Sequence, residues 1–379
     1  MGKIKRIKTA LIGSGAISGL YLKNIINNFY ILEMIGCSDI IPERSAARAE
    51  EFGIRQMTNE EILQDNNIKI VINTTYPLSH YEVNKAALTA GKHVYCEKMM
   101  AVTLEEGKEL IKLAASKNLL FTIAPDTFLG AGWQTIRHTI DNGLIGEPVS
   151  AIGVSIRAYH DTADTVSDIK SFVFSPGGGI PFDMGGYYLH NFIQLFGPIA
   201  RVSGFMKTRN PVRKYINPWN PSYAKKYTID SPNTMVGSLE FVNGTYASLT
   251  ITSEASLFFD PQFEIHGTEG ILTCFDPNEF NGPIMLYRMY NEPKPVTVVN
   301  SYTDECRGLG VADMAYALKN KRRPRAHYDL GYHAFEAIHG ILESCETGKV
   351  YTMKSKCPRP APIRMGQLYG HAQESFLDD

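Results

Sequence analysis

The sequence has few cysteines, only two tryptophans and no long apolar run. Its six cysteines are scattered over 379 residues, without the paired short spacing of a zinc site, and a chain of this length needs no disulfides. No apolar stretch approaches the roughly 20 residues that a membrane span requires. The apolar stretch after the basic residues 1–8 is only as long as a strand, which argues against a signal peptide. We therefore expect a cytoplasmic protein without a metal site or a membrane segment.

The sequence also lacks an excess of charge of either sign. The formal net charge is −1, so the basic excess typical of nucleic-acid-binding proteins is missing. The densest basic run, residues 319–325, predicts a solvated helix end and turn around Pro324. The hydrophobic fraction of 44% is sufficient for a buried core in each of two domains.

The first third of the chain alternates strand and helix patterns. Strands are expected over residues 9–12, 31–37, 68–73, 94–96 and 119–123, with helices over 17–25, 43–52, 81–90 and 104–116 between them. This alternation predicts a parallel sheet with right-handed crossovers, as in an α/β Rossmann-type domain. We place this NAD(P)-binding domain at residues 1–125.

From residue 126 onward the pattern becomes α+β. Helices are expected over 133–142, 182–196 and 330–347, a strand over 150–158, and hairpins over 234–253 and 263–274. The first hairpin contains Asn243-Gly244, the preferred pair of a two-residue type I′ turn. These elements predict a large, mostly antiparallel open sheet in a domain over 126–379 that binds substrate and forms oligomers. Residues 204–233 and the tail after Cys357 are expected to be loops or arms that contact a partner.

A glycine-rich turn, residues 13–18, joins the first strand to the first helix. Gly13 allows a tight turn, and Gly15 leaves room for a pyrophosphate at the helix N-terminus. Ser18 replaces the third glycine of the usual pattern, which predicts a slightly wider gap between helix and strand. Asp39 follows the second strand, where a carboxylate accepts from the ribose hydroxyls and repels a 2′-phosphate, so NAD is the expected cofactor. NADP stays possible because Arg44 could neutralise Asp39 or reach a phosphate.

Residues 91–98, GKHVYCEK, resemble the Gfo/Idh/MocA oxidoreductase family, in which a Glu-Lys-Pro sequence follows the fourth strand. Residues 73–80, 177–187 and 267–270 extend the resemblance over most of the chain. It implies a homodimer or homotetramer formed through the open sheet. It also implies further cofactor-binding residues, namely Ala16, Ile17, Thr74, Tyr76, Pro77, His80, Glu97 and Lys98.

The resemblance further implies that Lys98 lies near the nicotinamide, with Asp183 and Tyr187 as catalytic residues on a facing helix. These residue types suit the oxidation of a secondary alcohol, in which the hydroxyl proton leaves as hydride moves to the nicotinamide. A free tyrosine, with a pKa of about 10, is a poor base at neutral pH. A neighbouring lysine ammonium favours the phenolate and can bind the substrate oxygen.

The sequence departs from the family pattern in three places. Met99 replaces the proline after Lys98, which predicts a different loop path that shifts Lys98. Tyr187 replaces the histidine that is the commonest base of the family. His190 stands where the family often has an aspartate, and it is a second candidate for the base. The residues expected to line the substrate pocket are Asp126, Arg157, Tyr159, His160 and His190.

We therefore expect an NAD(P)-dependent oxidoreductase acting on a secondary hydroxyl of a sugar, glycoside or cyclic polyol. Two alternatives stay open. One is oxidation-assisted elimination of a glycosidic group with internally recycled NAD, which gives no net cofactor turnover. The other is a non-catalytic sensor of dinucleotide and sugar, for which residues 209–227 would offer a partner surface. The sequence gives no reason to expect a nucleic acid, a membrane or a metal as a partner.

Overall fold

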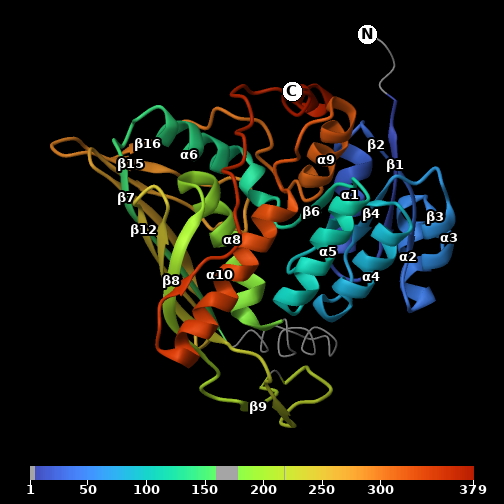
Figure 1. The fold of residues 1–379 in the computed structure, drawn as a ribbon, viewed down its shortest axis with the longest axis horizontal. Helices are drawn as coiled ribbons and strands as arrows, with labels where there is room; N and C mark the ends of the chain where they lie inside the picture. The colour runs from blue at the N-terminus through green and yellow to red at the C-terminus, as the bar shows by residue number, and fades with distance from the viewer. Residues whose placement is uncertain (1–4, 159–177, 217) are drawn as a thin grey trace.

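The structure is a computed structural model that describes residues 5–158, 178–216 and 218–379. Two large sheets dominate it (Figure 1), a six-stranded sheet of order β3-β2-β1-β4-β5-β6 and a nine-stranded sheet of order β16-β15-β14-β13-β7-β12-β11-β8-β17. The two-stranded sheet β10-β9 lies apart from both. In the part of the chain that is described, no helix is both long and apolar enough to cross a membrane.

The six-stranded sheet confirms the predicted Rossmann-type domain, because all its strand pairs are parallel. Its strands are β1 (Ile7–Ile12), β2 (Leu32–Ser38), β3 (Arg55–Gln56), β4 (Ile70–Asn73), β5 (His93–Cys96) and β6 (Phe121–Ile123). Its helices are α1 (Ser18–Asn28), α2 (Pro42–Phe52), α3 (Asn59–Gln64), α4 (Pro77–Thr89) and α5 (Leu104–Ser116). Helix α5 has the predicted bounds because Thr103 and Glu106 form a capping box at its start. Helix α3, which was not predicted, is also stabilised by a capping box.

The second sheet confirms the predicted open and mostly antiparallel arrangement, in which only β7 and β12 pair in parallel among the described strands. Its strands are β7 (Pro148–Ala158), β8 (Ile199–Lys207), β11 (Thr234–Phe241), β12 (Tyr246–Ala255), β13 (Phe259–Gly267), β14 (Ile271–Thr273), β15 (Met285–Tyr287), β16 (Lys294–Pro295) and β17 (Tyr351–Thr352). Strands β9 (Val212–Lys214) and β10 (Lys226–Thr228) lie within residues 204–233, so that segment is not only loop.

The helical elements of this part are η1 (Thr127–Leu129), α6 (Ala131–Asp141), α8 (Gly179–Phe196), α9 (Leu309–Asn320), α10 (Tyr328–Thr347) and η2 (Gly370–Phe376). Helices α8 and α10 cover one face of the nine-stranded sheet (Figure 1). Glycines on β8 and β11 allow α10 to approach, since a Cβ at Gly237 would lie 2.6 Å from Ile341 Cδ1. This packing places α8 between the two sheets, where it faces the first domain.

The hairpin between β11 and β12 is present, but its turn is not the predicted type I′. A type I′ turn needs positive φ at both central residues, and Asn243 is not among the described residues with positive φ. Gly244 N donates to Phe241 O at 3.0 Å, and Phe241 N donates to Thr245 O at 2.9 Å. Gly244, with a φ of 90°, is therefore the left-handed residue of a three-residue loop with a bulge.

The C-terminal part of the chain returns to pack on the first domain. Asn24 Nδ2 donates to Arg307 O at 3.1 Å, just before α9. The Glu374 carboxylate of η2 accepts from Tyr30 N at 2.7 Å and Ile31 N at 3.1 Å. The boundary between domains at residues 125 and 126 stays a prediction, because segments from beyond residue 300 complete the surroundings of the first sheet.

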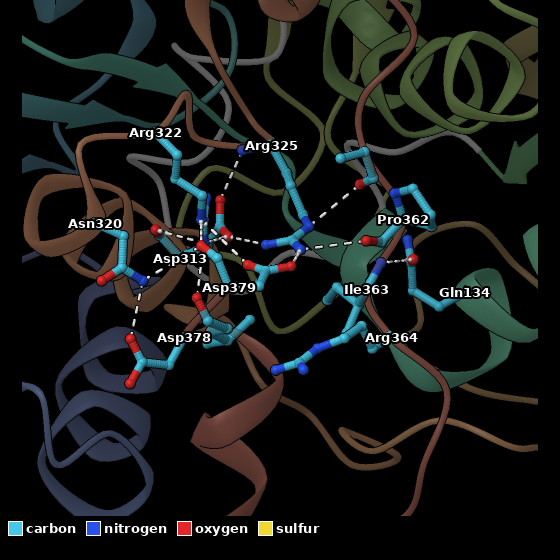
Figure 2. Close-up of polar contacts among 12 residues, drawn as sticks. Gln134, Asp313, Asn320, Arg322, Arg325, Pro362, Ile363, Arg364, Asp378 and Asp379 are labelled. Carbon is cyan, nitrogen blue, oxygen red and sulfur yellow. Dashed lines mark hydrogen bonds and ion pairs between the residues drawn. The ribbon is translucent and has the colours of Figure 1, made fainter.

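Much of the basic run 319–325 is paired with carboxylates rather than solvated (Figure 2). The Asp313 carboxylate of α9 is fully buried and accepts from Arg322 Nη2 at 2.7 Å and from Arg325 Nη1 at 2.6 Å. Arg325, whose side chain is 2% exposed, also pairs with Asp379 at 2.5 Å. The prediction of a solvated turn is therefore wrong for Arg325, because its partners lie far away in the sequence.

Replacing Asp313 tests how far this cluster stabilises the fold. Asp313→Asn is expected to lower the free energy of unfolding by about 3–5 kcal/mol, because it removes a charge that compensates a buried arginine. The exposed pair Lys85–Glu109 supplies the control, and Glu109→Gln is expected to cost less than about 1 kcal/mol. Urea denaturation of both variants measures the difference. Equal, small losses would contradict a stabilising role for the cluster.

Candidate functional site

The glycine-rich turn has the geometry of a phosphate-binding turn. Gly13 has a φ of +103°, and a Cβ there would lie 2.6 Å from Thr74 C and Thr75 N. Thr74 also holds the turn directly, since its Oγ1 donates to Gly13 O at 2.7 Å. A Cβ at Gly15, in contrast, would meet no atom within 4 Å. Only glycine fits position 13, and open space in front of Gly15 is available to a ligand at the N-terminus of α1.

A cavity of about 290 Å³ lies beside this turn. It is lined by Gly13, Gly15, Asp39, Arg44, Thr74 and Tyr76, among others. The Asp39 carboxylate is held in place because Oδ2 accepts from Ser14 N at 2.7 Å and Oδ1 from Ile41 N at 2.9 Å. An anchored carboxylate next to a cavity at the ends of parallel strands suits the ribose of a dinucleotide. The predicted cofactor residues Ala16 and Ile17 follow in the same turn.

The loop after β4 connects the glycine turn to the loop after β5. His80 is fully buried in α4, with Nδ1 2.5 Å from Met99 O and Nε2 2.9 Å from Thr75 O. Burial lowers the pKa of this imidazole. Pro77 occupies the first turn of α4 and is also buried, whereas Tyr76 is exposed and lines the cavity. The geometry therefore gives His80 a positioning role between two loops, whereas Tyr76 is accessible to a ligand.

The loop after β5 brings Lys98 to α8. The Lys98–Met99 peptide bond is cis, and Lys98 Nζ lies 2.8 Å from Asp183 Oδ1. With Met99 after it, Lys98 still contacts Asp183, and a shift of Lys98 relative to the family stays a prediction. Lys98 Nζ also lies 5.4 Å from the centre of the Tyr187 ring. The structure thus brings together all three predicted catalytic residues.

The charged neighbours of Lys98 favour its ammonium form despite its burial. The side chains of Lys98 and Asp183 are only 13% and 12% exposed. Burial by itself lowers the pKa of Lys98, but Asp183, Tyr187 and Glu97 together raise it above its usual value. Lys98 is consequently a fixed cation and hydrogen-bond donor at neutral pH, not a proton acceptor.

Glu97 and Asp126 each accept buried hydrogen bonds. Glu97 Oε1 accepts from Tyr21 at 2.6 Å, and the Tyr21 and Tyr95 hydroxyls are 3.5 Å apart. Asp126 Oδ2 accepts from the backbone N–H groups of Gly308 and Gly310, both at 2.9 Å. Burial raises the pKa of Asp126 to about 6. The contacts of Asp126 are therefore with the start of α9, which differs from the substrate contact that we expected.

The other residues predicted to contact substrate lie in different surroundings. The buried His190 contacts Gly186 O through Nδ1 at 2.8 Å and packs on Phe128, and burial lowers its pKa to about 4. Among the described contacts Tyr187, rather than His190, is the neighbour of Lys98. Arg157, at the end of β7, pairs with Asp276 at 3.5 Å. Tyr159 and His160 lie outside the described residues.

Arg307 is a residue of this site that the sequence did not reveal. It precedes α9 and its side chain is buried, and although burial lowers the pKa of its guanidinium, Tyr187 and Glu305 raise that pKa above its usual value. No motif surrounds Arg307 in the sequence, which predicted a helix end within residues 319–325 but not the start of α9. Arg307 is recognised only in the folded structure, where Asp126 accepts hydrogen bonds from the backbone next to it.

Comparisons with known proteins agree with this architecture. Residues 7–124 match a family model described as "Oxidoreductase family, NAD-binding Rossmann fold", and residues 133–273 match the "GFO/IDH/MocA C-terminal domain". An uncharacterized oxidoreductase of Schizosaccharomyces pombe is 32% identical over 54% of this chain and 56% of its own length. The NADP(+) scyllo-inositol 2-dehydrogenase of Bacillus subtilis is 28% identical over 55% of this chain and 57% of its own length. The chain thus spans a little over half the length of these curated relatives.

Solved structures extend the likeness of fold to almost the whole chain. A levoglucosan dehydrogenase in complex with NADH superposes with a TM-score of 0.80 at 21% identity, over 93% of this chain and 100% of that one. An aldose-aldose oxidoreductase from Caulobacter crescentus superposes with a TM-score of 0.76 at 17% identity, over 92% and 100% of the two chains. With a six-stranded NAD-binding Rossmann domain followed by the family's C-terminal domain, the chain belongs to the Gfo/Idh/MocA family of oxidoreductases.

Proposed function

We propose that the protein transfers hydride between a secondary hydroxyl of a sugar, glycoside or cyclic polyol and a nicotinamide cofactor. The observation that carries this proposal is the contact of Lys98 with Asp183 at 2.8 Å, with Tyr187 beside it. This cluster stands at the ends of parallel strands, as the glycine turn does, which is where cofactors bind in such sheets. Relatives named as inositol 2-dehydrogenases support a polyhydroxylated substrate.

Each residue of the cluster takes a separate role in this reaction. NAD, when bound, supplies the hydride acceptor. The Lys98 ammonium binds the oxygen of the reacting hydroxyl, and Asp183 fixes the direction of that ammonium. Lys98 keeps its own proton because its pKa is raised, so the hydroxyl proton passes to Tyr187. His190 is the weaker candidate for this step because its Nδ1 contacts its own helix at Gly186 O, whereas Tyr187 is the neighbour of Lys98.

We propose NAD as the preferred cofactor, with NADP as the alternative. The anchored carboxylate of Asp39 would repel a 2′-phosphate. Arg44 lines the same cavity and is the feature that favours NADP.

We also propose a homodimer or homotetramer in the cytoplasm. Phe205 on β8 pairs with Val236 on β11, and both side chains are exposed on the sheet face opposite α10. Apolar side chains on an open sheet favour association between subunits. The described cysteines are all free thiols, which supports a reducing compartment.

The proton-transfer role predicts how two substitutions act. Tyr187→Phe is expected to lower kcat by about 100-fold to 10,000-fold, because it removes the proton acceptor but leaves the cofactor cavity intact. Lys98→Met is expected to remove turnover as well. Absorbance of reduced nicotinamide, followed with NAD or NADP against cyclitols, aldoses and glycosides, measures both effects. The exposed Lys85→Met is the control and is expected to behave like the unchanged protein.

The same assay can contradict the proposal. A protein that binds NADH but reduces no NAD with any member of the panel would favour internal cofactor recycling or a sensor. Glycoside cleavage without net cofactor reduction would identify the recycling reaction.

Substitutions in the glycine turn test the cofactor site separately from catalysis. Gly15→Val places a side chain where no protein atom lies within 4 Å, so the fold is expected to tolerate it. The affinity for NADH is expected to fall by about tenfold or more, which corresponds to about 1.4 kcal/mol. Gly13→Ala is the matched contrast and is expected to destabilise the fold by about 1–3 kcal/mol. Fluorescence titration with NADH and thermal unfolding measure the two effects, and unchanged NADH binding by Gly15→Val would refute the placement.

The choice between NAD and NADP depends on one charge. Asp39→Asn keeps a hydrogen-bond acceptor near Ser14 N but removes the charge that repels a phosphate. We expect the ratio of NADPH to NADH affinity to rise by about tenfold. Dissociation constants of both reduced cofactors test this, and a ratio equal to that of the unchanged protein would assign selectivity to other residues.

A further inference from the structure

A second cavity lies at the opposite end of α1 from the glycine-rich turn. It has a volume of about 230 Å³, and none of the residues that line it lines the cofactor cavity. Asn28, which lines it, is the last residue of α1, whereas the glycine turn directly precedes Ser18, the first. Eleven helical residues span about 16 Å. Because crossover helices run back along a parallel sheet, this cavity lies at the edge away from the loop that carries Lys98.

Three segments that are far apart in the sequence form this cavity. They are the end of α1, residues 300–306 before α9, and residues 367–373 of the C-terminal tail. Ser301 joins two of them, because its Oγ donates to Leu368 O at 3.1 Å and accepts from Leu368 N at 2.9 Å. The second and third segments lie beyond residues 133–273, which the C-terminal family model matches. The cavity is therefore a feature of this chain that the family models do not cover.

The backbone at Tyr302 shows that tertiary contacts impose the shape of the cavity wall. Tyr302 has a φ of 73°, a left-handed conformation that is unfavourable for a residue with a side chain. Its side chain is 2% exposed, and its hydroxyl donates to Gln373 O at 3.0 Å. Its backbone O accepts from Ala131 N at 3.0 Å. An unfavourable conformation that surrounding contacts maintain is typical of sites where a ligand binds.

The lining offers many hydrogen-bonding groups and little charge. Asp304 is the one charged residue among the described residues that line the cavity. In the part of the chain that the structure describes, the side chains of Asn28, Thr303 and Asp304 make no hydrogen bond or ion pair with the protein. Amide and hydroxyl groups both donate and accept, so they can satisfy the hydroxyls of a ligand. They do not compensate the charge of an anion, and Asp304 would repel one.

An exposed aromatic ring lies at the rim of the cavity. Tyr369 belongs to the lining, and 82% of the surface of this residue is exposed. Its ring offers an apolar face on which the C–H groups of a saturated ring can pack. The volume of the cavity is below the roughly 300–1,000 Å³ of sites for drug-sized ligands. The occupant is therefore expected to be a single small ring that carries several hydroxyl groups.

We propose that this cavity binds a neutral polyhydroxylated ring, a monosaccharide or a cyclitol, at a site separate from the catalytic cluster. Asp304 accepts from neighbouring hydroxyls, Tyr369 packs on the ring, and Asn28 and Thr303 bind the remaining hydroxyls. A bound ring joins the C-terminal tail to α1 and stabilises its docking on the first domain. The inference does not depend on the proposed function, because it is drawn from this cavity alone.

A fluorescent reporter at the rim tests the site. Tyr369→Trp in the full-length protein keeps an aromatic face, and its emission is expected to change in a saturable way with myo-inositol or glucose. Tyr290→Trp, at a residue that is 98% exposed, is the control and is expected to give no saturable change. A local reporter is needed because concentrated polyols also stabilise proteins without binding, through exclusion from the surface. Glucose 6-phosphate is expected to bind about tenfold more weakly than glucose, because Asp304 repels its phosphate.

Two substitutions in the Tyr369→Trp protein test the lining. Asp304→Asn removes the charged acceptor and is expected to raise the dissociation constant by about tenfold. Asp260→Asn, at an exposed residue of β13, is the matched control and is expected to leave it unchanged. Thr303→Phe places a ring in the cavity and is expected to abolish the saturable response. Asp304 and Thr303 are both exposed, so both variants are expected to fold, which thermal unfolding without ligand checks.

Lys98→Met separates this cavity from the catalytic cluster. It is expected to keep the response of Tyr369→Trp, and loss of the response would show that the two sites are one. The inference would also be overturned by a response that is absent, that Tyr290→Trp shares, or that neither Asp304→Asn nor Thr303→Phe weakens. A saturable response without any reduction of NAD would refute the proposed function and leave this inference standing.

Discussion

The ion pair between Lys98 and Asp183 is the contact on which the site depends. Lys98 belongs to the loop that ends β5 in the first sheet, and Asp183 belongs to the first turns of α8 against the second sheet. Both side chains are largely buried, so the pair requires the two sheets to stand in one relative position. A buried pair adds little net stability, because desolvation offsets most of the attraction. Its value here is geometric, since it directs an ammonium toward the space beside Tyr187.

The site extends outward from this pair in two directions. Toward the cofactor cavity, the loops after β4 and β5 are joined by His80. Toward α9, Glu97 is bound by Tyr21, and Asp126 binds the backbone next to Arg307. Lys98 and Arg307 are therefore positioned by different elements, and each is supported by contacts that the other does not share.

Local sequence patterns predicted those elements that are stabilised by residues close to one another in the sequence. The glycine turn depends on backbone space, and α5 depends on a capping box within four residues, so both could be recognised from the sequence. Helix α9 could not, because its residues from Leu309 to Ala317 are all buried and lack an amphipathic period. Its N-terminal cap is Asp126, which is distant in the sequence.

Contacts in the candidate site that join residues far apart in the sequence could not be predicted for the same reason. The contacts of Asp126 are with backbone groups more than 180 positions away in the sequence, and Arg307 stands in no motif. The resemblance to a family supplied Lys98, Asp183 and Tyr187, since these stand in local motifs. It could not reveal Arg307, and it gave no basis for choosing Tyr187 over His190. In the structure the two candidates differ in their contacts, because Tyr187 lies beside Lys98 and His190 contacts Gly186 O.

The path of the chain between the sheets has a consequence for how substrate enters. The chain leaves the first sheet after β6, returns with α9 to contact β6, and leaves again along α10, which contacts both β6 and β8. Two domains joined by a single linker can open widely by rotation about that linker. Here the chain passes between the sheets several times, and Asp126 also binds the start of α9. A wide rotation would therefore break buried contacts at more than one place. Substrate and cofactor are therefore expected to exchange through rearrangement of loops at the rim, while the separation of the two sheets stays nearly constant.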